Sequence, residues 1–128
     1  KSLYSQLNVQ YKNKNIQIVK YKTLLKKYDD LNLKYKIGLI KIDVEGCEYE
    51  VLEGMHNSII SNKPIIILEF NQNSYKKIYD KYSRIYNFFI FKNNKFYKLK
   101  FLKQFSDLFL NNFFDHSRPR NFFLIKKI

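Results

Sequence analysis

The sequence predicts an α/β fold in which parallel strands are joined by crossover helices and are followed by antiparallel terminal strands. Two short apolar runs, residues 36–44 and 64–70, are typical of strands that are covered on both faces of a parallel sheet. A segment with apolar residues at helical spacing follows each run. The order strand, helix, strand, helix implies right-handed βαβ units and a parallel sheet.

The pattern before the first apolar run is weaker. The first residues are polar and lack periodicity, so we expect a loop there. Residues 15–21 alternate and predict a short strand. Residues 22–31 predict a short helix, because Leu24, Leu25 and Tyr28 lie at helical spacing.

The segment after residues 36–44 changes its period from strand to helix. Four apolar residues share one helical face: Val51, Leu52, Met55 and Ile59. They predict a helix near residues 47–61, which ends before Pro64 because proline disfavours a helical residue ahead of it. Three glutamates are expected to point away from the apolar face, the first of them in the first turn, where the helix dipole favours an anion: Glu48, Glu50 and Glu53.

The end of the chain predicts a second helix and then a hairpin. Residues 74–85 carry tyrosines and an isoleucine at helical spacing. Residues 86–101 predict two strands around the Asn-Asn pair at 93–94, since asparagine tolerates positive φ. Residues 102–114 are either helical or irregular, and residues 121–128 predict a closing strand.

The composition indicates one globular domain. The chain has 128 residues, of which 45% are apolar, and this is enough for a single core. No apolar run approaches the roughly 18 residues of a membrane span, and no signal peptide is recognisable. One cysteine excludes an internal disulfide and a cysteine-cluster metal site, so we expect a cytoplasmic protein.

The net charge of +13 is weak evidence for an anionic partner. Only three of the 24 basic residues are Arg, and the lysines are scattered, whereas nucleic-acid surfaces usually cluster their charge and include Arg. Abundant Lys, Asn, Ile, Tyr and Phe are what an A+T-rich genome favours. We therefore expect no nucleic-acid partner, with a basic module that binds nucleic acid or an anionic membrane as an alternative.

Carboxylates gather where the predicted strands end. Five of the eleven acidic residues lie between positions 43 and 53. Asp43 ends the first run, Glu45 follows in the turn, and Gly46 allows a tight connection to the helix. Glu69 holds the equivalent end of the next run. Because ligands gather at the carboxyl ends of parallel strands, these groups are candidates for a general base, for binding sugar hydroxyls or for a hard cation; helix caps are the alternative.

Two stretches of the chain resemble a known family. LIKIDVEGCEYEVLEGM at 39–55 and KPIIILEFN at 63–71 are similar to the central motif pair of the FkbM-type S-adenosylmethionine-dependent methyltransferases. The matching positions are 39–46, Glu48, Leu52, Gly54, Pro64 and Glu69. VKYKTLLKKY at 19–28 resembles the Thr-Leu-Asp segment of the family, with Leu25 where Asp is usual.

The resemblance implies a Rossmann-like methyltransferase fold, S-adenosylmethionine as cofactor, and O-methylation of a hydroxyl on a sugar, a glycan or a related small-molecule acceptor. It places Asp43 as the catalytic base or orienter, Glu45 beside it in substrate or cofactor contact, and Glu69 in support from the next strand. No metal is expected.

The chain also departs from the family pattern. It has neither the Asp-x-Gly-x-x-x-Gly loop that cradles the cofactor nor the Glu-Pro strand end that holds the ribose. We therefore expect residues 1–128 to be the carboxyl-terminal portion of one methyltransferase domain, with the main cofactor site upstream of Lys1. A non-catalytic remnant or accessory domain of the same fold is the alternative.

Two further residues are candidates for the site, and two others are expected to have no catalytic role. His116 and Arg118 lie in a polar loop before the last predicted strand and are candidates for contact with the acceptor, with a solvated loop as the alternative. Cys47 is expected to pack at the start of the helix, and His56 is expected on its solvated side.

Overall fold

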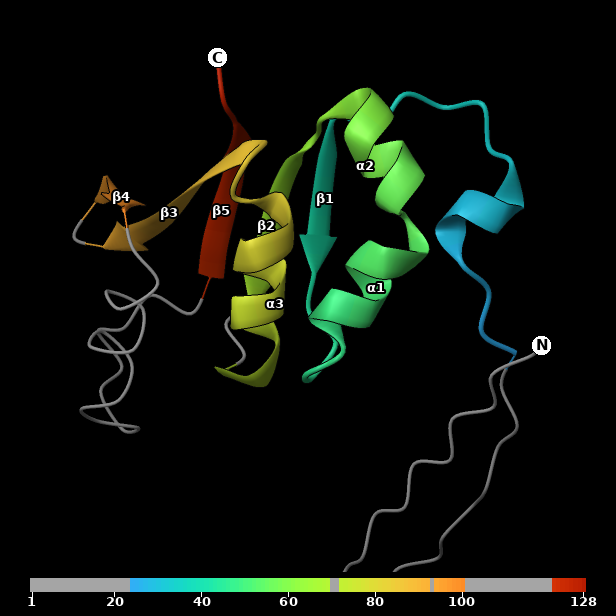
Figure 1. Ribbon diagram of the computed structural model, residues 1–128, viewed down its shortest axis with the longest axis horizontal. Helices are drawn as coiled ribbons and strands as arrows, with labels where there is room; N and C mark the ends of the chain where they lie inside the picture. Colours follow the sequence, from blue (N-terminus) through green and yellow to red (C-terminus); the bar gives the residue numbers. More distant parts are fainter. Residues whose placement is uncertain (1–23, 70–71, 93, 101–120) are drawn as a thin grey trace, which may run out of the picture.

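The two apolar runs form neighbouring parallel strands, as the sequence predicts. The computed structural model describes residues 24–69, 72–92, 94–100 and 121–128. Its elements run in the order η1 (Tyr28–Leu31), β1 (Leu39–Ile42), α1 (Glu48–Gly54), α2 (His56–Asn62), β2 (Ile65–Glu69), α3 (Gln72–Tyr82), β3 (Tyr86–Lys92), β4 (Lys95–Leu99) and β5 (Asn121–Lys126). The described part of the chain is thus a mixed α/β structure (Figure 1).

The sheet contains one parallel pair and three antiparallel pairs. Its strand order is β1-β2-β5-β3-β4. β1 and β2 are parallel, with Leu39 opposite Ile65. β5 lies between β2 and β3 and is antiparallel to both, so β3 runs in the same direction as β2. The predicted antiparallel end of the fold is confirmed in the described strands, whereas the insertion of β5 into the middle of the sheet was not predicted.

The predicted hairpin is confirmed. β3 and β4 pair from Phe88 opposite Leu99 to Lys92 opposite Lys95. Asn94 has a φ of 59°, the left-handed conformation that asparagine tolerates and that a tight turn requires. The predictions for residues 15–21 and 102–114 fall outside the described residues.

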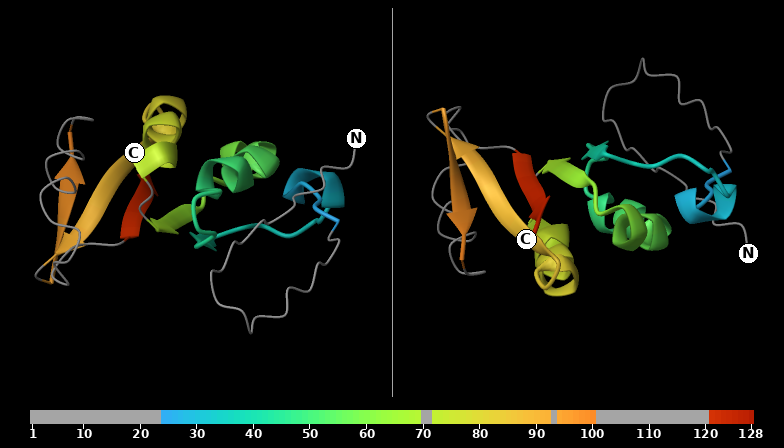
Figure 2. Two further views of the ribbon diagram at one scale, coloured as in Figure 1. Left: turned by 90° about the horizontal axis from the view of Figure 1, so that it is seen from below. Right: turned by 90° about the horizontal axis from the view of Figure 1, so that it is seen from above.

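The helices lie together on one face of the sheet (Figure 2). The buried core lies between them and the sheet. The strands contribute Ile42, Ile66, Leu68, Tyr86, Phe88, Ile90, Leu99, Phe122 and Leu124, the helices contribute Leu52, Ile59, Ile78 and Tyr82, and Met55 comes from between α1 and α2. On β1, Leu39 remains 57% exposed. The expectation that both apolar runs would be covered on both faces is therefore wrong for the described residues, where one face of β1 and β2 is covered.

The single helix predicted near residues 47–61 is in fact two helices that break at Met55. Gly54, a weak helix former, ends α1, and the backbone of Met55 leaves the helical region with a φ of −130°. The side chain of Met55 is nevertheless buried in the core. Because of the break, α2 has a separate N-terminus, whose first backbone N–H groups have no hydrogen-bond acceptor within the helix.

Asp29 caps these free amides from a distant part of the chain. Its carboxylate accepts hydrogen bonds from the backbone N–H groups of Asn57 at 2.8 Å and Ser58 at 3.1 Å, and from the Ser58 hydroxyl at 2.6 Å. These are the second and third residues of α2, whose N–H groups have no partner within the helix. The segment around Asp29 is thereby fixed to α2.

The helix predicted at 22–31 is wrong. Residues 24–27 are not helical, and only the 3-10 turn η1 forms. Leu24 and Leu25 stay exposed, so a helix there would gain little burial, and a helix of that length is marginal without it. Asn32, with a φ of 51°, then turns the chain away.

Asp29→Ala is expected to lower the free energy of unfolding by about 1–2 kcal/mol, the usual loss for a helix cap. Burial works to raise the pKa of Asp29, but the hydrogen bonds from Ser58 and Asn57 outweigh it and the pKa is lowered from 3.8. A lowered pKa means that the stabilisation is present above pH 3.8 and is lost as the pH falls through the folded value. Denaturant unfolding at pH 7 and at pH 3 measures both effects.

The matched control is the neighbouring Asp30→Ala, because Asp30 is exposed in the same 3-10 turn. It should change stability by less than about 0.5 kcal/mol at either pH. An equal loss for both variants would show that the carboxylate of Asp29 does not cap α2.

None of the helices in the described ranges has the length and hydropathy that crossing a membrane requires.

Candidate functional site

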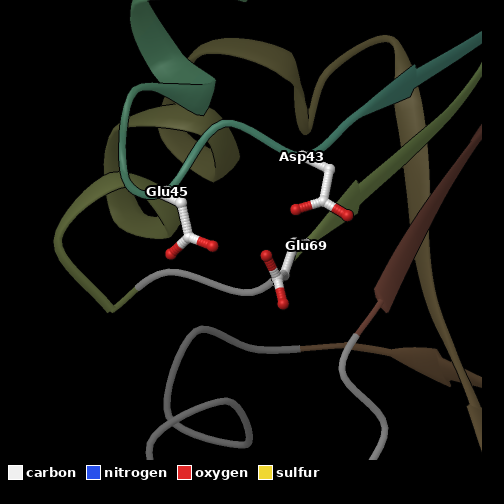
Figure 3. Close-up of side chains that lie close together, drawn as sticks. All are labelled: Asp43, Glu45 and Glu69. Atoms are coloured by element: carbon white, nitrogen blue, oxygen red, sulfur yellow. The ribbon is translucent and has the colours of Figure 1, made fainter.

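Three carboxylates meet at the carboxyl ends of β1 and β2. Asp43 follows the last residue of β1, Glu69 is the last residue of β2, and Glu45 lies in the turn between β1 and α1. Each offers an oxygen, and these oxygens all lie within 4.8 Å of one another (Figure 3). The structure thus brings together the three acidic residues that the sequence singled out. We call Asp43, Glu45 and Glu69 the acidic cluster.

A tight turn places Glu45 in the cluster. The N–H of Cys47 donates to the carbonyl of Val44 at 3.3 Å, and both residues between them have positive φ: 50° for Glu45 and 103° for Gly46. This is the sign pattern of a type I′ turn. Gly46 adopts it freely, but a residue with a Cβ is disfavoured there by about 1–2 kcal/mol. Other contacts must therefore keep the backbone of Glu45 in this disfavoured conformation.

Glu48 provides that support. It is the first residue of α1 and is 1% exposed, a burial that its expected place away from the apolar face of the helix did not indicate. One carboxyl oxygen accepts the N–H of Gly46 at 2.9 Å, and the other accepts the hydroxyl of Ser74 at 3.0 Å. A glutamate in the first turn of a helix can reach back to a backbone N–H just before the helix, so the place of Glu48 shortly after the turn glycine is the signal in the sequence for this bond. Glu50 and Glu53 are exposed, as predicted.

The electrostatics of the cluster separate the roles of Asp43 and Glu69. A hydrogen bond shared with Asp43 raises the pKa of Glu69 above 4.5, and burial and the charges of Asp43 and Glu45 raise it further. The same hydrogen bond lowers the pKa of Asp43 below 3.8, with help from the Lys41 ammonium group at 3.2 Å. Glu69 therefore keeps a proton to a higher pH than an ordinary glutamate, while Asp43 stays ionised to a lower pH than an ordinary aspartate.

Such a pair can take up a proton or bind a cation. Ionised Asp43 can accept a hydroxyl proton or orient the hydroxyl. The three oxygens also lie close enough to ligate one hard cation, and carboxylate oxygens are the ligands such cations prefer. The expectation of no metal stays a prediction.

The other candidate residues lie away from the cluster or outside the described residues. His116 and Arg118 belong to the undescribed ranges, so their contact with the acceptor stays a prediction. Cys47 is exposed at the start of α1. His56 is half-buried and not solvated as expected: its Nδ1 lies 3.2 Å from the hydroxyl of Tyr82. Because that hydroxyl donates to the carbonyl of Leu52, it accepts its hydrogen bond from His56.

Comparison with models of protein families identifies the family of the chain. A family model described as the Methyltransferase FkbM domain matches residues 2–99. The chain belongs to the FkbM methyltransferase family. The resemblance of the motif pair is thereby confirmed, and the matched range contains the whole acidic cluster and the turn that carries Glu45. Membership in this FkbM family supports methyltransferase activity, which requires a methyl donor.

Searches among curated proteins and among solved structures found no match.

Proposed function

We propose that this FkbM-family protein is an S-adenosylmethionine-dependent O-methyltransferase that acts at the acidic cluster. Its acceptor is a hydroxyl group on a sugar, a glycan or a related small molecule. The observation that carries the proposal is the meeting of Asp43, Glu45 and Glu69 at the carboxyl ends of two parallel strands, within a chain of a methyltransferase family.

The residues of the cluster fit the charge of the proposed cofactor. When bound, S-adenosylmethionine supplies an electrophilic methyl group on a cationic sulfur. Asp43 and Glu45 are exposed carboxylates, and negative groups next to a sulfonium stabilise its charge. The exposure of both side chains leaves them accessible to ligands.

Asp43 is the proposed base or orienter. The acceptor hydroxyl gives its proton to the carboxylate of Asp43 while its oxygen takes the methyl group. The hydrogen bond shared with Glu69 and the ion pair with Lys41 keep Asp43 ionised and fix its direction. A carboxylate that is already ionised and oriented needs no rearrangement when the proton moves.

We further propose that the sheet belongs to a larger Rossmann-like sheet, with additional strands of the same protein beside β1. Within the described residues, β1 pairs on one side with β2 and on the other side with no strand. Free strand edges expose unpaired N–H and C=O groups, which natural proteins cover or protect. These strands would supply the main contacts to the cofactor.

The test is a methyl-transfer assay with the full-length protein and S-adenosylmethionine labelled in the methyl group. A panel of sugars, glycans and other hydroxylated small molecules should contain an acceptor that gains the label in a base-stable ether. Label found only in a base-labile ester or on nitrogen would contradict O-methylation. No cofactor binding by the full-length protein would favour the non-catalytic remnant.

A further inference from the structure

Glu48 is a buried acidic residue that the proposed chemistry does not use. It is 1% exposed, and no ion pair involves it in the part of the chain that the structure describes. Burying a carboxylate is costly unless hydrogen bonds compensate for the lost water. An apolar side chain of similar size would avoid this cost, so packing alone does not account for an acidic residue here.

The two hydrogen bonds of Glu48 reach the turn that carries Glu45 and the helix α3. The first runs from the N–H of Gly46, in the turn where Glu45 has positive φ. The second runs from the hydroxyl of Ser74, which is 4% exposed and lies in the first turn of α3. α3 follows β2, whose last residue is Glu69. One buried side chain therefore connects the turn of Glu45 with the helix that begins after Glu69.

The geometry of the turn shows what this connection achieves. A residue with a Cβ at positive φ relaxes to other conformations when nothing holds it. The carboxyl oxygen of Glu48 that accepts the N–H of Gly46 fixes the peptide group that directly follows Glu45. The bond to Ser74 fixes the carboxyl group of Glu48 itself against α3.

We propose that Glu48 is a positioning residue, which holds Glu45 beside Asp43 and Glu69 by fixing the turn at residues 44–47 against α3. The inference rests on the proposed function, because it concerns the rate of the methyl transfer at this site. Glu48 itself touches neither cofactor nor acceptor in this account.

Three variants of the full-length protein test the role. Glu48→Met keeps a similar volume and removes both hydrogen bonds. Glu48→Gln keeps an acceptor for the Gly46 amide, and its NH₂ group can donate to the Ser74 hydroxyl. Glu50→Gln, on the exposed side of the same helix, is the matched control. For each protein we would measure kcat, the Kd of the cofactor, the melting temperature and the hydrogen-exchange rate of the Gly46 amide.

Glu48→Met is expected to lower kcat by roughly 10–100-fold, because displacements of about 1 Å in a catalytic group have effects of this size. It should bind the cofactor with a Kd within about threefold of wild type, since most of those contacts lie elsewhere. It should melt at a lower temperature, because the Gly46 amide and the buried Ser74 hydroxyl lose the carboxylate as their acceptor. The Gly46 amide should exchange faster. Glu48→Gln should restore kcat to within about threefold and restore the protection of that amide.

The outcomes separate the positioning role from a packing role. A kcat within threefold of wild type in Glu48→Met would overturn the inference, as would an equal loss in Glu48→Gln. If Glu48→Met does not fold, Ser74→Ala decides, because it removes the hydrogen bond from α3 to Glu48, keeps the bond of Glu48 to the Gly46 amide, and should still lower kcat several-fold. Absence of methyl transfer in the wild type would contradict the proposed function only. A Gly46 amide as protected in Glu48→Met as in wild type would overturn the role of Glu48 whatever the activity.

Discussion

Asp43→Asn is expected to lower the methyl-transfer rate of the full-length protein by roughly 10²–10⁴-fold, the range typical for loss of a general base. Asparagine keeps the size of the side chain but can neither take up a proton nor carry a charge. It also removes the carboxylate of Asp43, whose hydrogen bond with Glu69 is the largest cause of the raised pKa of Glu69. The measurement is kcat under saturating cofactor and acceptor.

Two comparisons make this result specific. Glu50→Gln removes a charge from the exposed face of α1 and should leave the rate unchanged. The cofactor affinity of Asp43→Asn should change much less than its rate, because the proposed additional strands supply most contacts. Near-normal turnover together with a clearly lower melting temperature would show that Asp43 is a structural residue and would remove it from the site.

Leu52→Ala is expected to lower the free energy of unfolding by about 2–5 kcal/mol, the range for truncating a fully buried leucine. Leu52 is 0% exposed in the middle of α1, where it belongs to the core between the helices and the sheet. Its carbonyl also accepts the hydroxyl of the buried Tyr82 on α3 at 3.2 Å. A cavity at this point loosens the contact between the two helices that Glu48 and Ser74 connect.

Denaturant unfolding of the purified variant measures this loss. Ile60→Ala on α2 is a suitable comparison, since Ile60 is partly exposed, and it should lose about 1 kcal/mol or less. A loss below about 1 kcal/mol for Leu52→Ala as well would mean that α1 does not pack on the sheet as described.

The local chemistry of the sequence was enough to predict the strands that carry the site. The runs that became β1 and β2 are short and rich in β-branched residues, and this length and composition favour strands over helices. Because parallel strands end at the same edge, the meeting of Asp43 and Glu69 followed from their places in the runs. The Asn pair at 93–94 predicted the hairpin for an equally local reason.

The features that were missed depend on contacts between distant residues. The helix at 22–31 does not form, since no apolar partner covers Leu24 and Leu25, and Asp29 instead binds α2 about 28 residues away. β5 inserts between β2 and β3, and neither neighbour is adjacent to it in the sequence. Periodicity cannot show such pairings, because it reports which face of a segment is apolar and not which segment covers it.

Glu48 illustrates the same limit inside the site. We expected Glu48 to point away from the apolar face of the helix, yet it is buried and accepts a hydrogen bond from Ser74 in the first turn of α3. The sequence placed Glu48 within the family motif and gave no indication of its burial.

A structure of the full-length protein with S-adenosylhomocysteine, the demethylated form of the cofactor, tests the central proposal most directly. The account predicts that its sulfur faces Asp43 and Glu45 at the carboxyl ends of β1 and β2, with the acidic cluster open to an acceptor on the same side. A cofactor bound at the amino ends of these strands, or at a site that none of the three carboxylates faces, would contradict it.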